Sequence, residues 1–328
     1  MNCKENEMKR LLIALFVLVI LIGSSVFYYI NKEKADLEEN KINYFTCNAN
    51  QYYAERIPEN PLFSIILSTY NRAEYLPRAI CSVLAQHYNN FEFIIIDDGS
   101  SDDTAKVIKK YAQKDKRIRY VKNEKNGGLV YSLNKGLGLA KGKYITRLDD
   151  DDYLFPEFFV EYAKHIDEYP EVVLFHSLPV SVNDSGETSE RLANVYKSLN
   201  DIDVFSVNSI PNIGATLRKD FLMENNLTYL SNYKAAEDYK LIADILMHGG
   251  KTHGIDKILT GYRIHQTNGK QYEINRQISS QRIQNQLIKF FSTGPSYDLC
   301  QVFKNMNETI YTVFTEDQLN YALKKYCR

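Results

Sequence analysis

Four consecutive carboxylates, Asp149 to Asp152, are the side chains of this sequence best placed for chemistry. A β-prone run at residues 143–146 precedes them, so we expect them at the carboxyl end of a strand, where open α/β sheets bind ligands. Adjacent carboxylates repel one another, and their oxygens suit hard cations such as Mg²⁺ or Mn²⁺, which in turn suit a diphosphate. An acidic run is often only a solvated turn. The strand before this run and the helical pattern after it favour a site for a metal ion and a diphosphate.

A second acidic pair, Asp97 and Asp98, ends the apolar run at residues 91–96. Taken alone, this pair with the Gly-Ser that follows it is typical of an ordinary turn. Because the carboxyl ends of parallel strands meet at one edge of a sheet, we expect both acidic groups to border the same crevice. A nucleotide would lie between them, with Asp97 or Asp98 near its base or ribose and with Asp149 and Asp151 facing the metal.

The elements that must position these residues alternate between strand and helix. Apolar and periodic runs predict them, in order, at residues 63–68, 75–86, 91–96, 103–112, 117–122, a helix ending at 140, 143–146 and 157–169. This alternation predicts an α/β fold with a mostly parallel, Rossmann-like sheet flanked by helices and joined by right-handed crossovers. Residues 273–291 and 316–325 predict further helices that pack against the domain.

The composition limits the classes of function. The chain has 328 residues, of which 44% are hydrophobic and 25% charged, and this is typical of a globular protein. Its net charge of -1 and the lack of a basic stripe with interleaved aromatic residues disfavour nucleic-acid binding.

Residues 11–30 are uncharged and nearly all apolar, which is about the length that a helix needs to cross a bilayer. A cleaved signal peptide is the alternative, but the apolar character resumes at residues 26–30. We therefore expect a short tail at 1–10, a transmembrane anchor at 11–30 and a polar stem at 31–60, in a single-pass membrane protein. Basic residues flank the span on both sides, so its orientation stays open: the catalytic domain would lie on the cytoplasmic face in a bacterium, or in the Golgi or ER lumen in a eukaryote.

Four ordered motifs resemble those of the inverting GT-A fold glycosyltransferases of family 2. They are SIILSTYNR, FEFIIIDDGSSDDT, NGGLVYSLNKGLGLAKGKYI and RLDDDD, followed by the thinner matches AAEDYKL and GYRIH. The resemblance implies a GT-A domain at residues 61–270, with a nucleotide-binding half at 61–152 and an acceptor half at 153–270. Residues 271–328 would form a helical extension.

The resemblance also implies roles for single residues. The nucleotide would contact Thr69, Tyr70, Arg72, Asp97, Asp98, Asn126, Arg147 and Asp149. The metal would be held by Asp149, Asp151 and His265. Asp238 would be the general base, and Asp152 and Glu237 would lie on the acceptor side. Many relatives carry an arginine before the asparagine of the fourth helix. This chain has Leu133 before Asn134, so Arg147 becomes the candidate for that phosphate contact.

Residue types alone leave blander roles open at these positions. Glu237 and Asp238 precede an apolar helical pattern, and acidic residues often stabilise a helix start. His265 alone is more often a surface or core histidine than a metal ligand. Gly214 is a candidate residue on the acceptor side for a reason of its own, since a glycine lets the backbone approach a bound sugar closely.

The leading interpretation is a membrane-anchored inverting glycosyltransferase of polysaccharide biosynthesis, a hexosyl- or N-acetylhexosaminyltransferase. It would move a sugar from a nucleotide-sugar donor, a UDP-sugar first, to a hydroxyl of a glycan, lipid-linked saccharide or glycoprotein, with Mn²⁺ or Mg²⁺ on the diphosphate. The alternatives are a non-catalytic sugar-binding or scaffolding relative and a sugar-nucleotide nucleotidyltransferase. The latter resembles this fold but carries a Gly-rich, Lys-bearing loop after the first strand, where this chain has STYNR. A glycosidase would need two separated carboxylates rather than a clustered run.

Overall fold

The first half of the chain alternates strands and helices, as its sequence predicts. The computed structural model describes residues 56–182, 188–189, 210–233, 235–263 and 270–293. Its first elements are β1 (Phe63–Thr69), α2 (Leu76–Leu84), β2 (Phe91–Asp97), α3 (Thr104–Ala112), β3 (Ile118–Lys122), α4 (Leu129–Leu139) and β4 (Tyr144–Asp149). Every residue of β2 is buried, as expected of a strand that helices cover on both faces. The four strands are parallel, in the order β3-β2-β1-β4.

The second half departs from the mostly parallel sheet that the sequence predicts. Its elements are β5 (Tyr153–Leu154), α5 (Phe158–Glu168), β6 (Val172–Val182), β7 (Thr188–Ser189), β8 (Thr216–Arg218), α7 (Lys219–Glu224), α8 (Glu237–Met247), β9 (Lys251–Arg263) and α9 (Lys270–Thr293). β8 is antiparallel to both β4 and β6, and β5 is antiparallel to β9, whereas β6 and β9 are parallel. An antiparallel neighbour needs no crossover helix, so these strands join the sheet without a regular strand-helix alternation. The sheet is therefore mixed.

Two segments predicted to lack strands contain short ones. The sequence predicts a turn at residues 153–156, but Tyr153 pairs with Gly261 and Leu154 with Thr260, which makes β5 an extra strand. The polar stretch at residues 181–203 begins inside β6, and the end of β6 pairs with β7. In both places a partner strand distant in the sequence supplies the pairing, and short segments carry little strand signal of their own.

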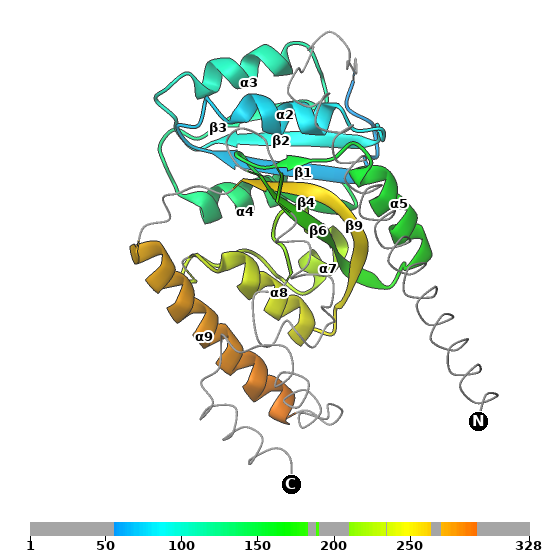
Figure 1. Cartoon of the computed structure of the whole chain (residues 1–328), viewed down its shortest axis with the longest axis vertical. Coiled ribbons are helices and arrows are strands. Elements are labelled where there is room, and N and C mark those ends of the chain that lie inside the picture. The colour runs from blue at the N-terminus through cyan, green and yellow to red at the C-terminus, as the bar shows by residue number, and fades with distance from the viewer. Residues whose placement is uncertain (1–55, 183–187, 190–209, 234, 264–269, 294–328) are drawn as a thin grey trace, which may run out of the picture. The chain divides into compact units, whose positions relative to one another are not determined.

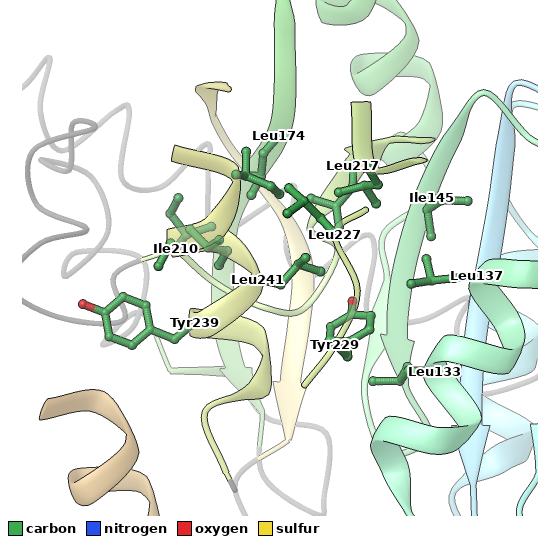
Figure 2. Packing of buried hydrophobic residues seen from close by; sticks show 14 of the residues in the cluster. Leu133, Leu137, Ile145, Leu174, Ile210, Leu217, Leu227, Tyr229, Tyr239 and Leu241 are labelled. Carbon is green, nitrogen blue, oxygen red and sulfur yellow. The ribbon is translucent and has the colours of Figure 1, made fainter. Parts of the chain in front are cut away.

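Helices cover both faces of the parallel part of the sheet (Figure 1). α2 and α3 pack together on one face, and α4 packs against β1 and β2 from the other. A buried hydrophobic cluster then joins α4 and β4 to β8, α8 and α9, and Figure 2 shows Leu133 and Leu137 of α4 on one side of it and Tyr239 and Leu241 of α8 on the other. This cluster holds α8, which begins at Glu237, against the strand that ends in the acidic run.

No helix in the described part of the chain is long and apolar enough to span a membrane. Residues 11–30, where the sequence predicts the anchor, lie outside the described residues. The predicted stem (31–60) is described only from residue 56 onward, and the predicted helix at 316–325 is not described.

Candidate active site

A cleft of about 1030 Å³ lies at the carboxyl ends of β1 and β4. The strand register sets Thr69 beside Asp97 and Ser68 beside Asp149, so the strand ends deliver their acidic residues to one edge of the sheet. The cleft is lined by nine of the residues that the sequence singles out: Thr69, Tyr70, Arg72, Asp98, Asn126, Arg147, Asp149, Asp151 and Glu237. Four others that the structure describes are not part of that lining: Asp97, Asp152, Gly214 and Asp238.

The loop after β1 is tied to the loop after β2. Asn71 takes a left-handed backbone conformation (φ 52°), and its N–H donates to Ser100 Oγ at 3.0 Å. The N–H of Arg72 donates to Thr104 Oγ1 at 3.1 Å. The side chain of Asn71 joins the same link, since its Oδ1 accepts the N–H of Ser101 at 2.9 Å. Tyr70 and Arg72 line the cleft, and Tyr70 is exposed over 46% of its surface.

Asp97 turns into the protein rather than into the cleft. It is fully buried, and its carboxylate accepts hydrogen bonds from Ser100 N–H (2.8 Å) and Tyr120 Oη (2.9 Å). Burial and then the Asp97 contact raise the pKa of Tyr120, so this phenol stays a donor. In this arrangement Asp97 organises the β2 turn, whereas the sequence places it near the nucleotide.

Asp98 shapes a glycine-containing loop at the edge of the cleft. Its carboxylate accepts hydrogen bonds from Asn123 Nδ2 (2.6 Å), Gly127 N–H (3.0 Å) and Gly128 N–H (2.7 Å). Burial alone would raise the pKa of Asp98, but these hydrogen bonds hold it below its ordinary value, so the carboxylate is charged at neutral pH. The loop that carries Asn126 is thereby fixed beside the cleft.

The acidic run divides between the cleft and the protein interior. Asp150 and Asp151 line the cleft, and Asp151 Oδ2 lies 3.9 Å from Nη2 of Arg72. Burial raises the pKa of Asp150 to about 7. Asp152 points away and accepts the backbone N–H of Arg263 at 2.9 Å. Burial, and then the charges of Asp151 and its neighbours, raise the pKa of Asp152 above its ordinary value.

Arg147 joins the acidic run to the start of α8. Its Nε and Nη2 donate to Asp149 at 2.9 and 3.2 Å, and its Nη1 donates to Glu237 at 3.1 Å. Asn212 can turn its amide oxygen to the same guanidinium, 3.0 Å from Nε. Burial raises the pKa of Glu237, although the Arg147 charge opposes the rise. Because its donors already meet carboxylates, Arg147 is better suited to hold two acidic residues in position than to bind a phosphate.

Asp238 lies at the start of α8, next to the lining residue Glu237. It is half-buried, and its Oδ1 accepts the N–H of Tyr239 at 2.7 Å. The Asp238 charge contributes to the raised pKa of Glu237, so the two carboxylates are close. His265 lies outside the described residues.

Gly214 packs inside the protein and does not line the cleft. Its backbone has a φ of 70°, and an added Cβ would come within 2.7 Å of both Phe158 and Thr260. Its N–H donates to the carbonyl of Arg147 at 3.2 Å. The glycine is therefore required by local packing beside β4, which is a different reason from the close sugar contact that the sequence suggests.

Some lining residues carried little or no signal in the sequence. Asp150 stands within the acidic run, but the residue pattern alone does not separate it from its neighbours. Asn134 of α4 accepts the N–H of Tyr229 (3.0 Å) and donates to its carbonyl (2.9 Å). The remaining lining residues of this kind follow Tyr229 along the chain or belong to α9: Leu230, Ser231, Asn232, Tyr233, Ala235 and Asn275.

The carboxylates of the cleft fit a divalent ion of the Mg²⁺ or Mn²⁺ type. Asp149 and Asp151 offer oxygen ligands only, and they retain 34% and 18% side-chain exposure. Within the described residues no three ligating side chains converge on one point. Such ions are commonly bound through one or two carboxylates with substrate phosphates and water completing the shell, so this pair would be sufficient in the presence of a diphosphate.

The sequence model of the Glycosyl transferase family 2 matches residues 64–231, just over half of the chain. An uncharacterized glycosyltransferase of Haemophilus influenzae is 28% identical over 275 residues, which are 80% of this chain and 84% of that protein. Another, of Methanocaldococcus jannaschii, is 29% identical over 208 residues, 63% of this chain and 72% of that protein.

Two solved structures have a similar fold. The crystal structure of S. aureus TarS in complex with UDP-GlcNAc has a TM-score of 0.54 at 20% identity and covers 81% of this chain and 71% of its own. The mannosyltransferase PcManGT from Pyrobaculum calidifontis, in complex with GDP-Man and Mn²⁺, has a TM-score of 0.58 at 16% identity and covers 90% of this chain and 82% of its own. At these identities the likeness extends to the fold.

Proposed function

The chain belongs to glycosyl transferase family 2, and from that membership we propose that it transfers a sugar, with inversion, from a nucleotide-sugar donor to a hydroxyl group. A UDP-sugar is the first candidate donor, and a hexose or N-acetylhexosamine the first candidate sugar. The acceptor would be a glycan, a lipid-linked saccharide or a glycoprotein. The UDP-GlcNAc bound by TarS and the GDP-Man and Mn²⁺ bound by PcManGT support a nucleotide-sugar donor and a divalent ion.

One observation carries this proposal: a single cleft at the strand ends holds polar side chains for a nucleotide and carboxylates for its diphosphate. Tyr70 and Asp98 border it from the β1 and β2 ends, and Asp149 and Asp151 from the β4 end. The nucleotide would lie along Tyr70 and the loop at Asn126, and the diphosphate would face the acidic run. Asp97 would act indirectly, because its carboxylate is bonded inside the β2 turn.

The protein groups around the reacting atoms would divide the work. Asp149 and Asp151 would hold the divalent ion, which when bound stabilises the negative charge of the departing diphosphate. Arg147 would keep Asp149 and Glu237 in position. Asp238 would take the proton of the acceptor hydroxyl. At the same time the oxygen of that hydroxyl would bond to the anomeric carbon, and the bond from this carbon to the diphosphate would break. One displacement of this kind inverts the anomeric carbon and needs no covalent enzyme intermediate.

The Asp238→Asn variant tests the assignment of the base. General-base help contributes about 10²- to 10⁴-fold to the rate, so we expect turnover to fall by that factor while donor binding stays at the wild-type level. Asp167→Asn, an exposed change on α5, is the matched control and should leave both unchanged. Near-normal turnover of Asp238→Asn would show that Asp238 is not the base.

A non-catalytic sugar-binding relative is the second candidate. It would bind the donor but transfer nothing, and the same assay separates it from an enzyme by the absence of any sugar transfer in the wild type. We keep it second because the metal carboxylates and the candidate base are all present.

We also propose the single-pass anchor at residues 11–30, the stem at 31–60 and the catalytic domain at 61–270, with 271–328 as its helical extension. The apolar run at 11–30 supports the anchor. The full chain should stay with the membrane fraction after carbonate washing, whereas a chain lacking residues 1–30 should be released. Release of the full chain would exclude the anchor.

A further inference from the structure

The two arginines that line the cleft are held in different ways. The Arg147 guanidinium is buried, and its donors are bonded to two carboxylates at 2.9 to 3.2 Å. The Arg72 side chain keeps 40% exposure, and its Nη2 lies 3.9 Å from Asp151 Oδ2, which is too far for a hydrogen bond. Its Cζ lies 5.2 Å from the centre of the Tyr75 ring. In the part of the chain that the structure describes, the Arg72 guanidinium therefore has only long contacts, and its N–H groups can donate to a ligand.

The backbone that carries Arg72 is fixed in place. The N–H groups of residues 71–73 donate at 3.0, 3.1 and 3.2 Å to side chains that follow β2, which are those of Ser100, Thr104 and Asp102. Thr104 is fully buried at the start of α3. A guanidinium on a fixed backbone loses only the freedom of its own side chain when a ligand binds, so the entropy cost of binding is small.

The lining of the cleft carries more negative than positive charge. Among the described residues its charged side chains are two arginines and five carboxylates: Arg72, Arg147, Asp98, Asp149, Asp150, Asp151 and Glu237. Arg263 lies 5.2 Å from the same Tyr75 ring, but it does not line the cleft, and its Nε donates to the carbonyl of Asp151. A diphosphate adds further negative charge, so its binding needs cations in direct contact with it. Apart from a divalent ion, Arg72 is the lining cation that can make this contact.

The transfer step makes the need for positive charge greatest. When the bond from the anomeric carbon to the diphosphate breaks, its electron pair goes to the diphosphate oxygen, and the terminal phosphate gains negative charge. A guanidinium keeps its own charge and presents a fork of N–H donors that matches phosphate oxygens. It stabilises the leaving diphosphate by hydrogen bonds and gives up no proton. Donors aimed at the place where charge develops are worth most in the transition state.

We propose that Arg72 is a catalytic residue that binds the terminal phosphate of the donor diphosphate and stabilises the charge that this phosphate gains on leaving. This inference rests on the proposed function, and it gives Arg72 the phosphate contact for which the sequence makes Arg147 the candidate. Arg72 lies beside Asp151, a carboxylate proposed to hold the divalent ion, so its guanidinium is next to the place of the diphosphate. Arg147 keeps its positioning role, because its donors are already bonded to carboxylates.

The test measures binding to the full chain by titration calorimetry in the presence of Mn²⁺. The probes are UDP-GlcNAc, UDP and UMP, or the matching guanosine or cytidine compounds if wild type binds that class instead. Arg72→Met should weaken the binding of UDP about 10- to 150-fold, which is the value of hydrogen bonds to a charged group. UDP-GlcNAc should lose less, because its terminal phosphate carries less charge, and UMP should bind as it does to wild type. Arg72→Lys keeps the charge without the fork, so its affinity for UDP should lie between those of wild type and Arg72→Met.

Two controls separate this role from a merely structural one. Arg72→Met without ligand should melt close to the wild-type temperature, because an exposed ion pair contributes little to stability. Arg56→Met changes an exposed arginine before the amino end of β1 and should bind all three probes as wild type does. Unchanged UDP binding in Arg72→Met, an equal loss for UMP, or equal UDP affinities of Arg72→Lys and Arg72→Met would overturn the inference alone. A folded wild type that binds no nucleoside diphosphate and no nucleotide sugar would overturn the proposed function, and the inference with it.

Discussion

Replacing Arg147 with methionine tests the ion-pair network that holds the cleft together. The change keeps much of the side-chain volume but leaves Asp149 and Glu237 without their partner. Removing one member of a buried ion pair costs about 3–5 kcal/mol. Glu237 keeps only 10% side-chain exposure, whereas Asp149 keeps 34% and is partly screened by water. We therefore expect Glu237 to carry most of the loss, about 3 kcal/mol of the free energy of unfolding at neutral pH.

The loss should depend on pH with a defined sign. Burial already raises the pKa of Glu237, and the Arg147 charge opposes that rise. Without Arg147 the pKa of Glu237 rises further. The uncompensated charge is then fully present above the raised pKa and disappears as the pH falls through it. The difference in stability between wild type and Arg147→Met should shrink as the pH is lowered from neutral toward 5.

Urea denaturation followed by circular dichroism measures this difference. Arg119→Met is the matched control, because Arg119 donates one hydrogen bond to the carbonyl of Leu139 at 3.2 Å. The free energy of unfolding of this variant should fall by no more than about 1 kcal/mol. Adding Glu237→Gln to Arg147→Met should recover at least about 1 kcal/mol, because it removes the unpaired charge. A loss below about 1 kcal/mol in Arg147→Met, or no recovery in the double variant, would refute the reasoning.

Two further changes test local features of the fold. Gly214→Ala forces a left-handed backbone on alanine and drives its Cβ to 2.7 Å from Phe158, so we expect a loss of about 2–5 kcal/mol in the same denaturation assay. Gly138→Ala is its control: the new Cβ meets no atom within 4 Å inside α4, and stability should rise by about 0.5–1 kcal/mol. Equal effects of the two changes would contradict the packing account. Asn134→Ala releases both backbone groups of Tyr229 and should lower the free energy of unfolding in the same assay; an unchanged stability would contradict the anchoring role.

The parallel half of the fold was accessible from the sequence because local signals and tertiary structure agree there. Buried runs such as residues 63–68 and 91–96 are mostly apolar, and each is followed by a helical pattern of ordinary length. The second half gave no such agreement. β8 has three residues, and β5 has two. Strands this short exist because neighbours distant in the sequence pair with them, and no local pattern reports such a pairing.

The candidate site shows the same division. The strand order predicts that Asp98 and Asp149 meet at one edge, and they line one cleft. The partners of the side chains cannot be read from the sequence pattern. The Asp97 carboxylate accepts a hydrogen bond within its own turn, and the Arg147 guanidinium donates to Glu237, which is distant in the sequence. Asn275 gave no signal, because its place in the cleft depends on how α9 docks.

The binding of nucleotide sugars to the purified protein tests the central claim most directly. The melting temperature would be measured with UDP-, GDP- and CDP-sugars, with and without Mn²⁺, for wild type and Asp151→Asn. A ligand at 100 times its Kd adds about 2.7 kcal/mol of stability, which corresponds to a rise of roughly 5–10 °C. We predict such a Mn²⁺-dependent rise with one nucleotide class in wild type and its loss in Asp151→Asn. No rise with any nucleotide sugar in the folded protein, or an equal rise in Asp151→Asn, would contradict a donor site built on the acidic run.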